Sequence, residues 1–409
     1  MADIGIIMNT MRDSAGLPAH PSIFQALMLL TWVFHIVFVH LTLGAAGLAI
    51  WTYVRRDSHV HWARLSEAMT KVAKVGVSLL IVLGVAPLLF TQVIYDPQWY
   101  ASNVLSARWA IAFIFTLIVA YSMWFYFYAQ NHGRRATRFM AVFAGAALGL
   151  FVLDGLIMHV LSYQALLPSQ WQEWYAPGGV VDTSGSKLHA MQPARFLFIM
   201  GLSVPAIGLY LLAYADYVGA RADADAAYLD RVRNLGAVIA WRGAALSAVL
   251  MVAWQLTNPF ALGLWKSPLG WVLVLWCAAL ALWVKSRKHF EGLGYAALGS
   301  GVAMTGILAA WREVIRIAHL SPLGYNIADY PVHADVPSLT LFSLTLLGVG
   351  GLVGGYYLRL IYQAGLTVGT YTAGKWTSRW GTAAVGVLVI WIMVFFAYGI
   401  NIYIRNVFK

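Results

Sequence analysis

Two histidines stand in the first long apolar stretch of the chain, where an ionisable side chain is unusual. His35 and His40 lie within "TWVFHIVFVHLTLG", residues 31–44. Neutral imidazole is a natural axial ligand of haem iron, and a haem has enough apolar surface to lie between helices. The alternative is a histidine that only hydrogen-bonds to a neighbouring helix. Because five residues turn a helix by about 140°, the two rings cannot point at the same iron.

A second group of ionisable residues occurs late in the chain, in "AAWREVIRIAHL". Glu313, Arg316 and His319 follow each other in steps of three, so neighbouring members can touch on one flank of a helix. A carboxylate can ligate high-spin iron or accept a proton, and an arginine can pair with a haem propionate. The alternative is an internal Glu–Arg pair that only stabilises packing.

Three further ionisable residues lie in apolar runs: Asp154, His159 and Arg242. Such a residue costs about 2.5–3.5 kcal/mol inside a membrane helix, which makes each a functional candidate. For Arg242 the sequence leaves two interpretations open. It pairs with a haem propionate, or it forms a buried ion pair with Asp154.

The elements that must position these residues are membrane-spanning helices. Of the 409 residues 61% are apolar and 11% are charged, whereas soluble domains have about 25% charged residues. Apolar runs of about 20 residues, enough to cross a bilayer, recur along the chain. We therefore expect an all-α polytopic membrane protein forming a single transmembrane domain over residues 1–409, with outer loops at about 165–193 and 319–336. The nine to ten expected spans are, approximately, 23–54, 72–94, 107–130, 139–163, 194–218, 234–256, 268–284, 292–318, 337–362 and 380–403.

The distribution of charge predicts the orientation and excludes some functions. Basic residues concentrate in the links after the odd-numbered spans, so the positive-inside rule places these links in the cytoplasm and both termini outside. The formal charge of +11 is explained by these short loops, and we expect no nucleic acid partner. Cys277 is the only cysteine, which excludes a disulfide within the chain and a CxxCH haem attachment. Any haem must be bound non-covalently.

Two of these segments resemble subunit I of the cytochrome bd quinol oxidases. Residues 24–50, "FQALMLLTWVFHIVFVHLTLGAAGLAI", are similar to the first helix of that family, and His35 falls on its haem-ligand position. Glu313 and Arg316 match the family's Glu-x-x-Arg segment. The resemblance implies a bd-like helix bundle in a bacterial cytoplasmic membrane, non-covalent haem b, and membership of a respiratory complex.

The chain also departs from the family pattern. The positions of the two low-spin haem ligands read Phe198 and Ala244, and His40 stands where the family usually has proline. The third span contains no acidic residue where the family has the glutamates of its oxygen site and proton path. The outer loop between the sixth and seventh spans, which binds quinol in the family, is reduced to about 14 residues, "TNPFALGLWKSPLG". We therefore do not expect oxygen reduction, or quinol oxidation by the family's route.

The leading hypothesis is a membrane b-type cytochrome with one or more haems b. It passes electrons between the quinone pool, or a membrane partner, and a c-type cytochrome on the outer face. The resemblance implies His35 as an iron ligand, with Glu313 as a metal-binding residue nearby. His159 is a candidate second ligand because its span ends at the same membrane level, and His40 and His319 are the others. The alternatives are a haem-free anchor subunit, a divergent active oxidase and, with less support, a transporter.

Overall fold

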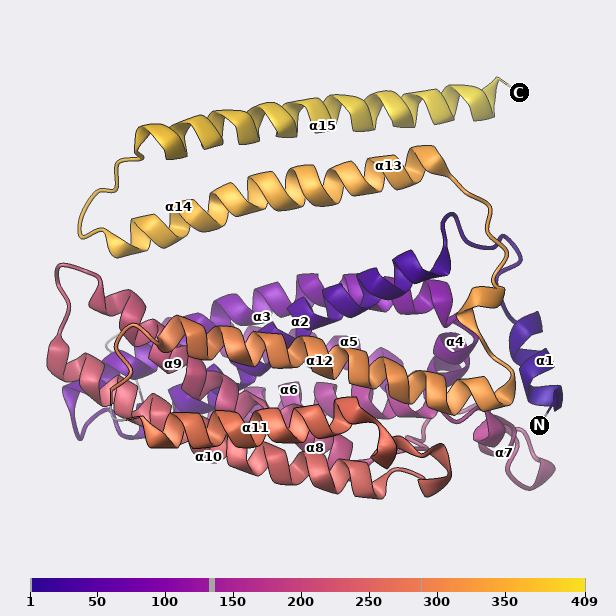
Figure 1. The fold of residues 1–409 in the computed structure, drawn as a ribbon, viewed down its shortest axis with the longest axis horizontal. Helices are drawn as coiled ribbons and strands as arrows, with labels where there is room; N and C mark the ends of the chain where they lie inside the picture. Colours follow the sequence, from indigo (N-terminus) through magenta and orange to yellow (C-terminus); the bar gives the residue numbers. More distant parts are fainter. Residues whose placement is uncertain (1, 132–136, 288, 409) are drawn as a thin grey trace. The chain divides into compact units, whose positions relative to one another are not determined.

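The computed structural model describes residues 2–131, 137–287 and 289–408, and in these residues nearly all regular structure is helical. Ten helical segments among them are long and apolar enough to cross a membrane, which confirms the predicted fold class (Figure 1). The spans are α2 (Pro21–Val54), α3 (Val60–Ile94), α5 (Ala107–Asn131), α6 (Phe139–Gln164), α8 with α9 (Pro193–Gly201 and Ser203–Gly219), α10 (Ala226–Thr257), α11 (Pro268–Ser286), α12 (Gly294–Leu320), α13 with α14 (Val336–Leu344 and Gly354–Leu366) and α15 (Lys375–Val407).

Most helix boundaries lie within a few residues of the predicted ones, with two clear exceptions. Helix α10 begins at Ala226 and not near residue 234. Helix α3 begins at Val60 and not near residue 72, and the His59 side chain accepts a hydrogen bond from the backbone N–H of His61 at its start. Hydropathy detects only the part of a helix that lies in lipid, whereas the backbone continues to hydrogen-bond beyond it. Shorter helices at the ends of the spans were not predicted: α1 (Ala2–Thr10), α4 (Asp96–Leu105) and α7 (Trp171–Tyr175).

The chain divides into two compact units. Unit 1 contains Met1–Ser14, Pro21–Asp216 and Asp230–Tyr330, and unit 2 contains Ala15–His20, Tyr217–Leu229 and Pro331–Lys409. The expectation of one transmembrane domain over the whole chain stays a prediction. The two units are described separately below.

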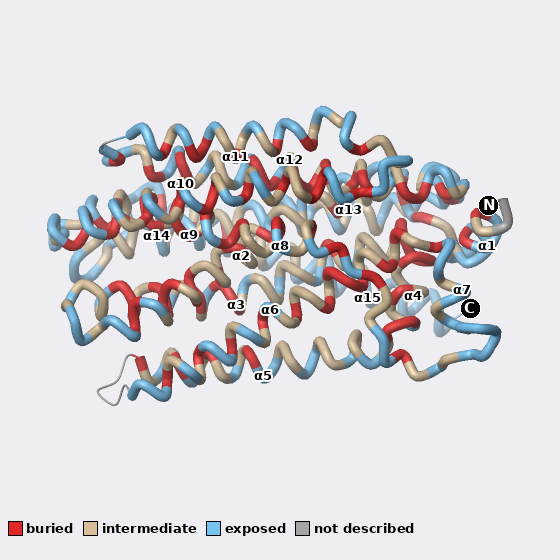
Figure 2. The backbone as a smooth tube through the Cα atoms, turned by 90° about the horizontal axis from the view of Figure 1, so that it is seen from below, coloured by how far each residue is buried: buried red, intermediate tan, exposed pale blue. Residues whose placement is uncertain are grey.

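Unit 1 is an antiparallel bundle in which α2 packs along α3, α5 packs on α6, and α12 contacts α2. The helices approach closely at small residues: a Cβ at Gly76 of α3 would collide with the Thr42 side chain of α2. The span made of α8 and α9 has the largest share of buried residues (Figure 2). Trp254 and Trp311 pack edge to face in the core. Helix α2 begins and helix α12 ends at the same end of unit 1. We call this end of the unit the Glu313 end.

Unit 2 contains a long helical hairpin. Helices α13 and α14 are joined by a π-helical stretch, Thr345–Val353, and this stretch packs against α15. Asp335 caps α13 by accepting a hydrogen bond from the backbone N–H of Ser338. The flanks of the hairpin are largely apolar and exposed, as expected of helices that face lipid.

Candidate functional site

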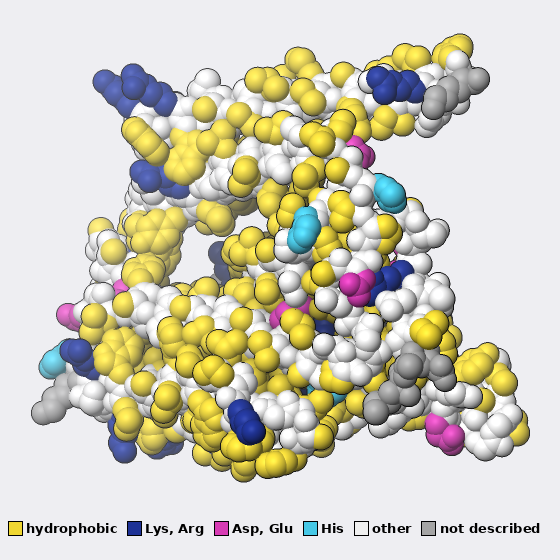
Figure 3. Space-filling view, turned by 45° about the vertical axis from the view of Figure 1, so that its right-hand side comes forward, with side chains coloured by type: hydrophobic (Ala, Val, Ile, Leu, Met, Phe, Trp, Pro, Cys, Tyr) yellow, Lys and Arg dark blue, Asp and Glu magenta, His cyan; other side chains and the backbone are white. Residues whose placement is uncertain are grey.

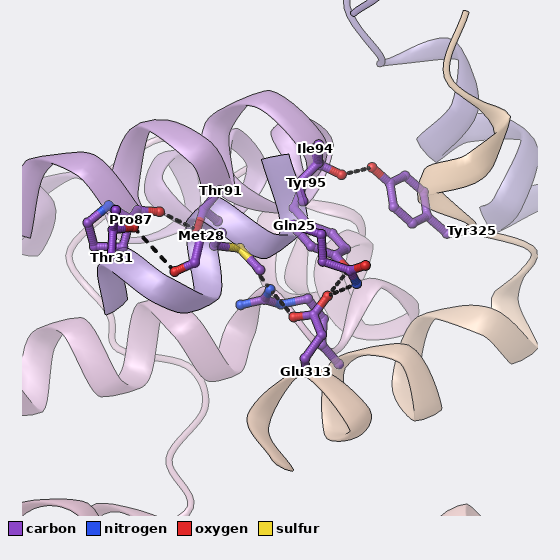
Figure 4. Close-up of polar contacts among 10 residues, drawn as sticks. Gln25, Met28, Thr31, Pro87, Thr91, Ile94, Tyr95, Glu313 and Tyr325 are labelled. Carbon is purple, nitrogen blue, oxygen red and sulfur yellow. Dashed lines mark hydrogen bonds and ion pairs between the residues drawn. The ribbon is translucent and has the colours of Figure 1, made fainter. Parts of the chain in front are cut away.

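Glu313 is the centre of a polar cluster at the Glu313 end of unit 1 (Figure 4). Its Oε1 atom accepts hydrogen bonds from Gln25 Nε2 at 2.7 Å and from the Tyr95 hydroxyl at 2.5 Å. Its Oε2 atom accepts from Arg316 Nη1 at 2.6 Å. The side chains come from α2, from the residue after α3 and from α12, so the cluster ties three helices together. The carboxylate accepts three hydrogen bonds of the about four that its two oxygens can take, which leaves one lone pair on Oε2.

Three arginines converge beside this carboxylate. Arg195, Arg312 and Arg316 line a cavity of about 20 Å³, together with Ser162, Leu166 and Ile315. A cavity of this size holds about one water molecule. Glu313 is the only carboxylate that forms an ion pair with any of the three arginines in the described part of the chain.

The two arginines without a carboxylate are held by weaker partners. Arg195 donates from Nη2 to the Ser162 hydroxyl at 3.1 Å, and its buried Nη1 atom has no hydrogen-bond partner among the described residues. The guanidinium of Arg312 lies 3.9 Å from the centre of the Trp32 ring, and its Nε atom is also buried and unpaired in the same residues. A buried charge is costly unless it is paired and hydrogen-bonded. Within the described residues, one buried guanidinium, Arg195, and one half-buried guanidinium, Arg312, therefore form no ion pair with a carboxylate.

His35 has the hydrogen-bond pattern of a metal-ligating histidine. Its Nδ1 atom lies 2.9 Å from the carbonyl oxygen of Leu80 on α3. Since a carbonyl can only accept, Nδ1 carries the proton and Nε2 keeps its lone pair. Ligating histidines are oriented in this way by a hydrogen bond from the other ring nitrogen. The ring packs against Gly84, where a Cβ would lie 2.9 Å from His35 Cε1.

The other three candidate histidines lie in different surroundings. His159 Nε2 accepts a hydrogen bond from the Gln192 backbone at 3.3 Å, and its ring stacks on Tyr163. Tyr163 also contacts the ring of His319, so the structure brings His159 and His319 to the same aromatic side chain. His40 and His319 each have a buried Nε2 atom without a partner in the described residues. Within those residues, no three His, Cys, Asp or Glu side chains form a group that could hold a metal.

Of the two interpretations of Arg242 that the sequence leaves open, the ion pair with Asp154 is not formed among the described residues. Asp154 Oδ1 accepts a hydrogen bond from the Thr116 hydroxyl of α5 at 2.5 Å, and its Oδ2 atom is buried without a partner among the described residues. Arg242 is exposed, and its guanidinium lies 5.4 Å from the ring centre of Trp241. Lys285, in the last turn of α11, contacts the same ring. Arg242 therefore lies towards the end of unit 1 opposite the Glu313 end.

A row of tyrosines continues the cluster beyond the spans. Tyr330 donates a hydrogen bond to Asp96, and Tyr325 donates to the Ile94 carbonyl at 2.8 Å. The rings of Tyr95 and Tyr325 lie 6.0 Å apart, and Arg12 stacks on Tyr325. Burial raises the pKa of the Tyr95 hydroxyl. Burial also raises the pKa of the Asp96 carboxyl, although the hydrogen bonds that this carboxylate accepts act in the opposite direction. The phenols therefore stay protonated and act as hydrogen-bond donors.

Sequence reasoning did not single out four members of the cluster: Gln25, Tyr95, Arg195 and Arg312. A signal was available for Arg312, because "WREVIR" places two bases and one acid within five residues. No comparable signal marks Gln25 or Tyr95, since both reach Glu313 only through tertiary packing.

Comparison with known proteins adds information on the fold. No family model and no curated protein matches the sequence. The structure is similar to that of the bd oxidase from Geobacillus thermodenitrificans, with a TM-score of 0.62 and 13% sequence identity. The match covers 84% of this chain and 98% of the other chain. The chain therefore has a bd-oxidase-like membrane helix bundle.

Proposed function

We propose that this chain is a membrane b-type cytochrome, an electron-transfer subunit of a respiratory complex. The observation that carries the proposal is the excess of positive charge at the Glu313 end. Three arginines line one cavity there, and within the described residues only Glu313 forms an ion pair with any of them, which leaves two guanidiniums without an anion. Haem b has two propionates, so its charge matches this excess.

The residues fit the two chemically distinct parts of a haem. His35 offers an unprotonated Nε2 atom, and the Leu80 carbonyl fixes the ring. Arg195 and Arg312 are the candidate partners of the propionates, because guanidinium binds carboxylate strongly. Glu313 holds Arg316 in place and keeps the local charge from rising further. A bound haem would supply a one-electron carrier, which is what an electron-transfer subunit needs.

The proposed surroundings follow from charge and fold. The basic links are placed in the cytoplasm by the positive-inside rule, so the Glu313 end faces outward in the cytoplasmic membrane of a bacterium. A c-type cytochrome would dock on the outer loops, and the quinone pool or a membrane subunit would be the other redox partner. Oxygen reduction is not part of the proposal, because α5 contains no carboxylate.

A second candidate function is a haem-free anchor that holds redox subunits at the membrane. Two observations favour it. The cavity beside the arginines holds about one water molecule, and Glu313 already accepts three hydrogen bonds from protein side chains. In that case a small anion or a group from a partner subunit would neutralise the arginines.

A pyridine haemochrome spectrum of the purified full chain separates the two functions. We expect a haem b spectrum from the wild type and from His289→Ala, a control at an exposed histidine. His35→Ala should lose this signal or convert it to that of another ligation state. A wild type without b-type absorbance would leave only the anchor function. An unchanged His35→Ala spectrum would exclude His35 as a ligand.

A further inference from the structure

The turn of the unit 2 hairpin contains a second polar cavity that the proposed function does not use. It has a volume of about 470 Å³ and lies where α14 ends and α15 begins. This volume is within the usual range of small-molecule sites. Its polar lining includes Arg359, Gln363, Tyr371, Lys375 and Thr377.

The cavity is shaped by hydrogen bonds that hold the turn. Gln363 Oε1 accepts from the Tyr371 hydroxyl at 2.7 Å and from Thr377 Oγ1 at 3.2 Å. These two bonds connect the last turns of α14 to the loop and to the start of α15. The walls are therefore positioned before any ligand binds, which lowers the entropy cost of binding.

The charge of the cavity is positive and has no compensation from its own lining. Arg359 and Lys375 are both exposed, and no acidic residue lines the cavity. Asp335, at the opposite end of the hairpin, is the only acid between residues 331 and 409. The guanidinium of Arg359 lies 5.1 Å from the ring centre of Trp376, which holds it at the mouth of the cavity. Two cations, one of them a guanidinium, are the chemistry that recognises a phosphate group.

The surroundings favour a phosphate carried by a lipid. Apolar side chains flank the cavity along the hairpin, and the nearby Trp376, Leu358 and Tyr357 are exposed. Lys and Arg side chains lie at the ends of the hairpin and apolar ones along its length (Figure 3). Aromatic residues with Lys and Arg at a helix end mark the level of the lipid headgroups. Basic pockets between spans bind anionic headgroups.

We propose that the cavity between α14 and α15 binds the headgroup phosphate of an anionic phospholipid. Arg359 and Lys375 contact the phosphate, the Gln363 hydrogen bonds with Tyr371 and Thr377 hold the walls in place, and the acyl chains lie along the apolar flank of the hairpin. Inorganic phosphate has the same binding chemistry but gains nothing from that flank.

The test is native mass spectrometry of the full chain, titrated with phosphatidylglycerol and, separately, with phosphatidylcholine. We expect Arg359→Gln and Lys375→Gln each to weaken phosphatidylglycerol binding roughly fivefold. Lys375→Arg keeps the positive charge and should bind phosphatidylglycerol like the wild type. The matched control is Arg379→Gln, which removes an exposed base one turn along α15 that does not line the cavity. It should bind like the wild type.

Three outcomes would overturn the proposal. Equal losses in Arg379→Gln and Lys375→Gln would show a general attraction between bases and anionic lipid. Equal binding of phosphatidylcholine and phosphatidylglycerol would show that the bases do not select the headgroup. Displacement of bound phosphatidylglycerol by inorganic phosphate alone would identify a soluble anion as the ligand.

Discussion

The two units of the chain place their charged side chains in opposite ways. In unit 1, Arg195 and Glu313 are buried inside the bundle, with exposed fractions of 6% and 5%. In unit 2, Arg359 and Lys375 lie exposed at the end of a hairpin whose flanks are apolar. A buried charge requires a partner of opposite charge, so a buried arginine without one indicates the charge of a missing ligand. An exposed base at a helix end is stabilised by water and lipid headgroups and requires no such partner. We therefore distinguish the proposed haem site inside unit 1 from the proposed lipid site on the surface of unit 2.

The largest expected effect comes from removing the carboxylate of the buried site. Glu313→Ala leaves Arg316 without its ion-pair partner and Tyr95 without its acceptor. We expect the free energy of unfolding to fall by about 3–5 kcal/mol. Thermal unfolding in detergent, followed by tryptophan fluorescence, measures this. Glu313→Gln keeps an acceptor oxygen and so isolates the contribution of the charge. If both variants unfolded at the same midpoint temperature as the wild type, the buried charge of unit 1 would not require its partners, and the difference between the two units would be contradicted.

A smaller effect is expected where His35 packs against α3. Gly84→Ala places a Cβ 2.9 Å from the imidazole, so the ring or the helix must shift. Overpacking of this kind costs about 1–3 kcal/mol. Gly149→Ala on α6 is the matched control, because its Cβ would meet no atom within 4 Å. The same unfolding assay should show a loss for the first variant only. Equal midpoints would mean that the ring is not fixed at Leu80.

In unit 2 an acidic residue has only a local role. Asp335→Ala removes the side chain that accepts from the backbone N–H of Ser338 at the start of α13. Loss of an N-cap costs about 0.5–2 kcal/mol. Asp335→Asn keeps a capping oxygen and should cost less. A cost for Asp335→Ala as large as that of Glu313→Ala would contradict the assignment of a merely local role.

The smallest effect depends on pH and concerns a loop of unit 1. Hydrogen bonds from Ser184 and the nearby Lys187 ammonium lower the pKa of Asp182 to about 2. Because the folded pKa lies below the unfolded value near 3.9, the stabilisation is present above that value and is lost as the pH falls towards 2. Hydrogen exchange of the Ser184 amide, corrected for intrinsic rates, should accelerate in this range. Asp182→Asn should show little further change with pH. If the exchange rate of the Ser184 amide in the wild type did not change with pH in this range, the stabilising role of the Asp182 carboxylate would be contradicted.

Most of the fold could be predicted from the sequence because lipid leaves few choices to the backbone. A chain in the bilayer must satisfy its own hydrogen bonds, so an apolar run of about 20 residues becomes a helix. The same criterion missed the start of α3 at Val60, because residues 60–71 are helical but polar.

The candidate site could be predicted only where its members lie close together in sequence. The contact between Glu313 and Arg316 follows from their i,i+3 spacing and is present at 2.6 Å. Arg195 joins them through the packing of α8, which a single sequence does not reveal. The alternative of an ion pair between Arg242 and Asp154 could not be decided from the sequence, because hydropathy places a residue in a span without showing which way it faces.

In the proposed function, the arginines of unit 1 that form no ion pair hold the carboxylates of a bound haem. The most direct test is the haem b content per chain, by pyridine haemochrome, after detergent purification of three proteins: the wild type, Arg312→Gln and Arg242→Gln. Arg242 is the matched control because it is an exposed arginine of unit 1 outside the cluster. We expect at least one haem per chain for the wild type and for Arg242→Gln, and a several-fold lower haem content for Arg312→Gln. Equal haem content in both variants, or no haem in the wild type, would contradict it.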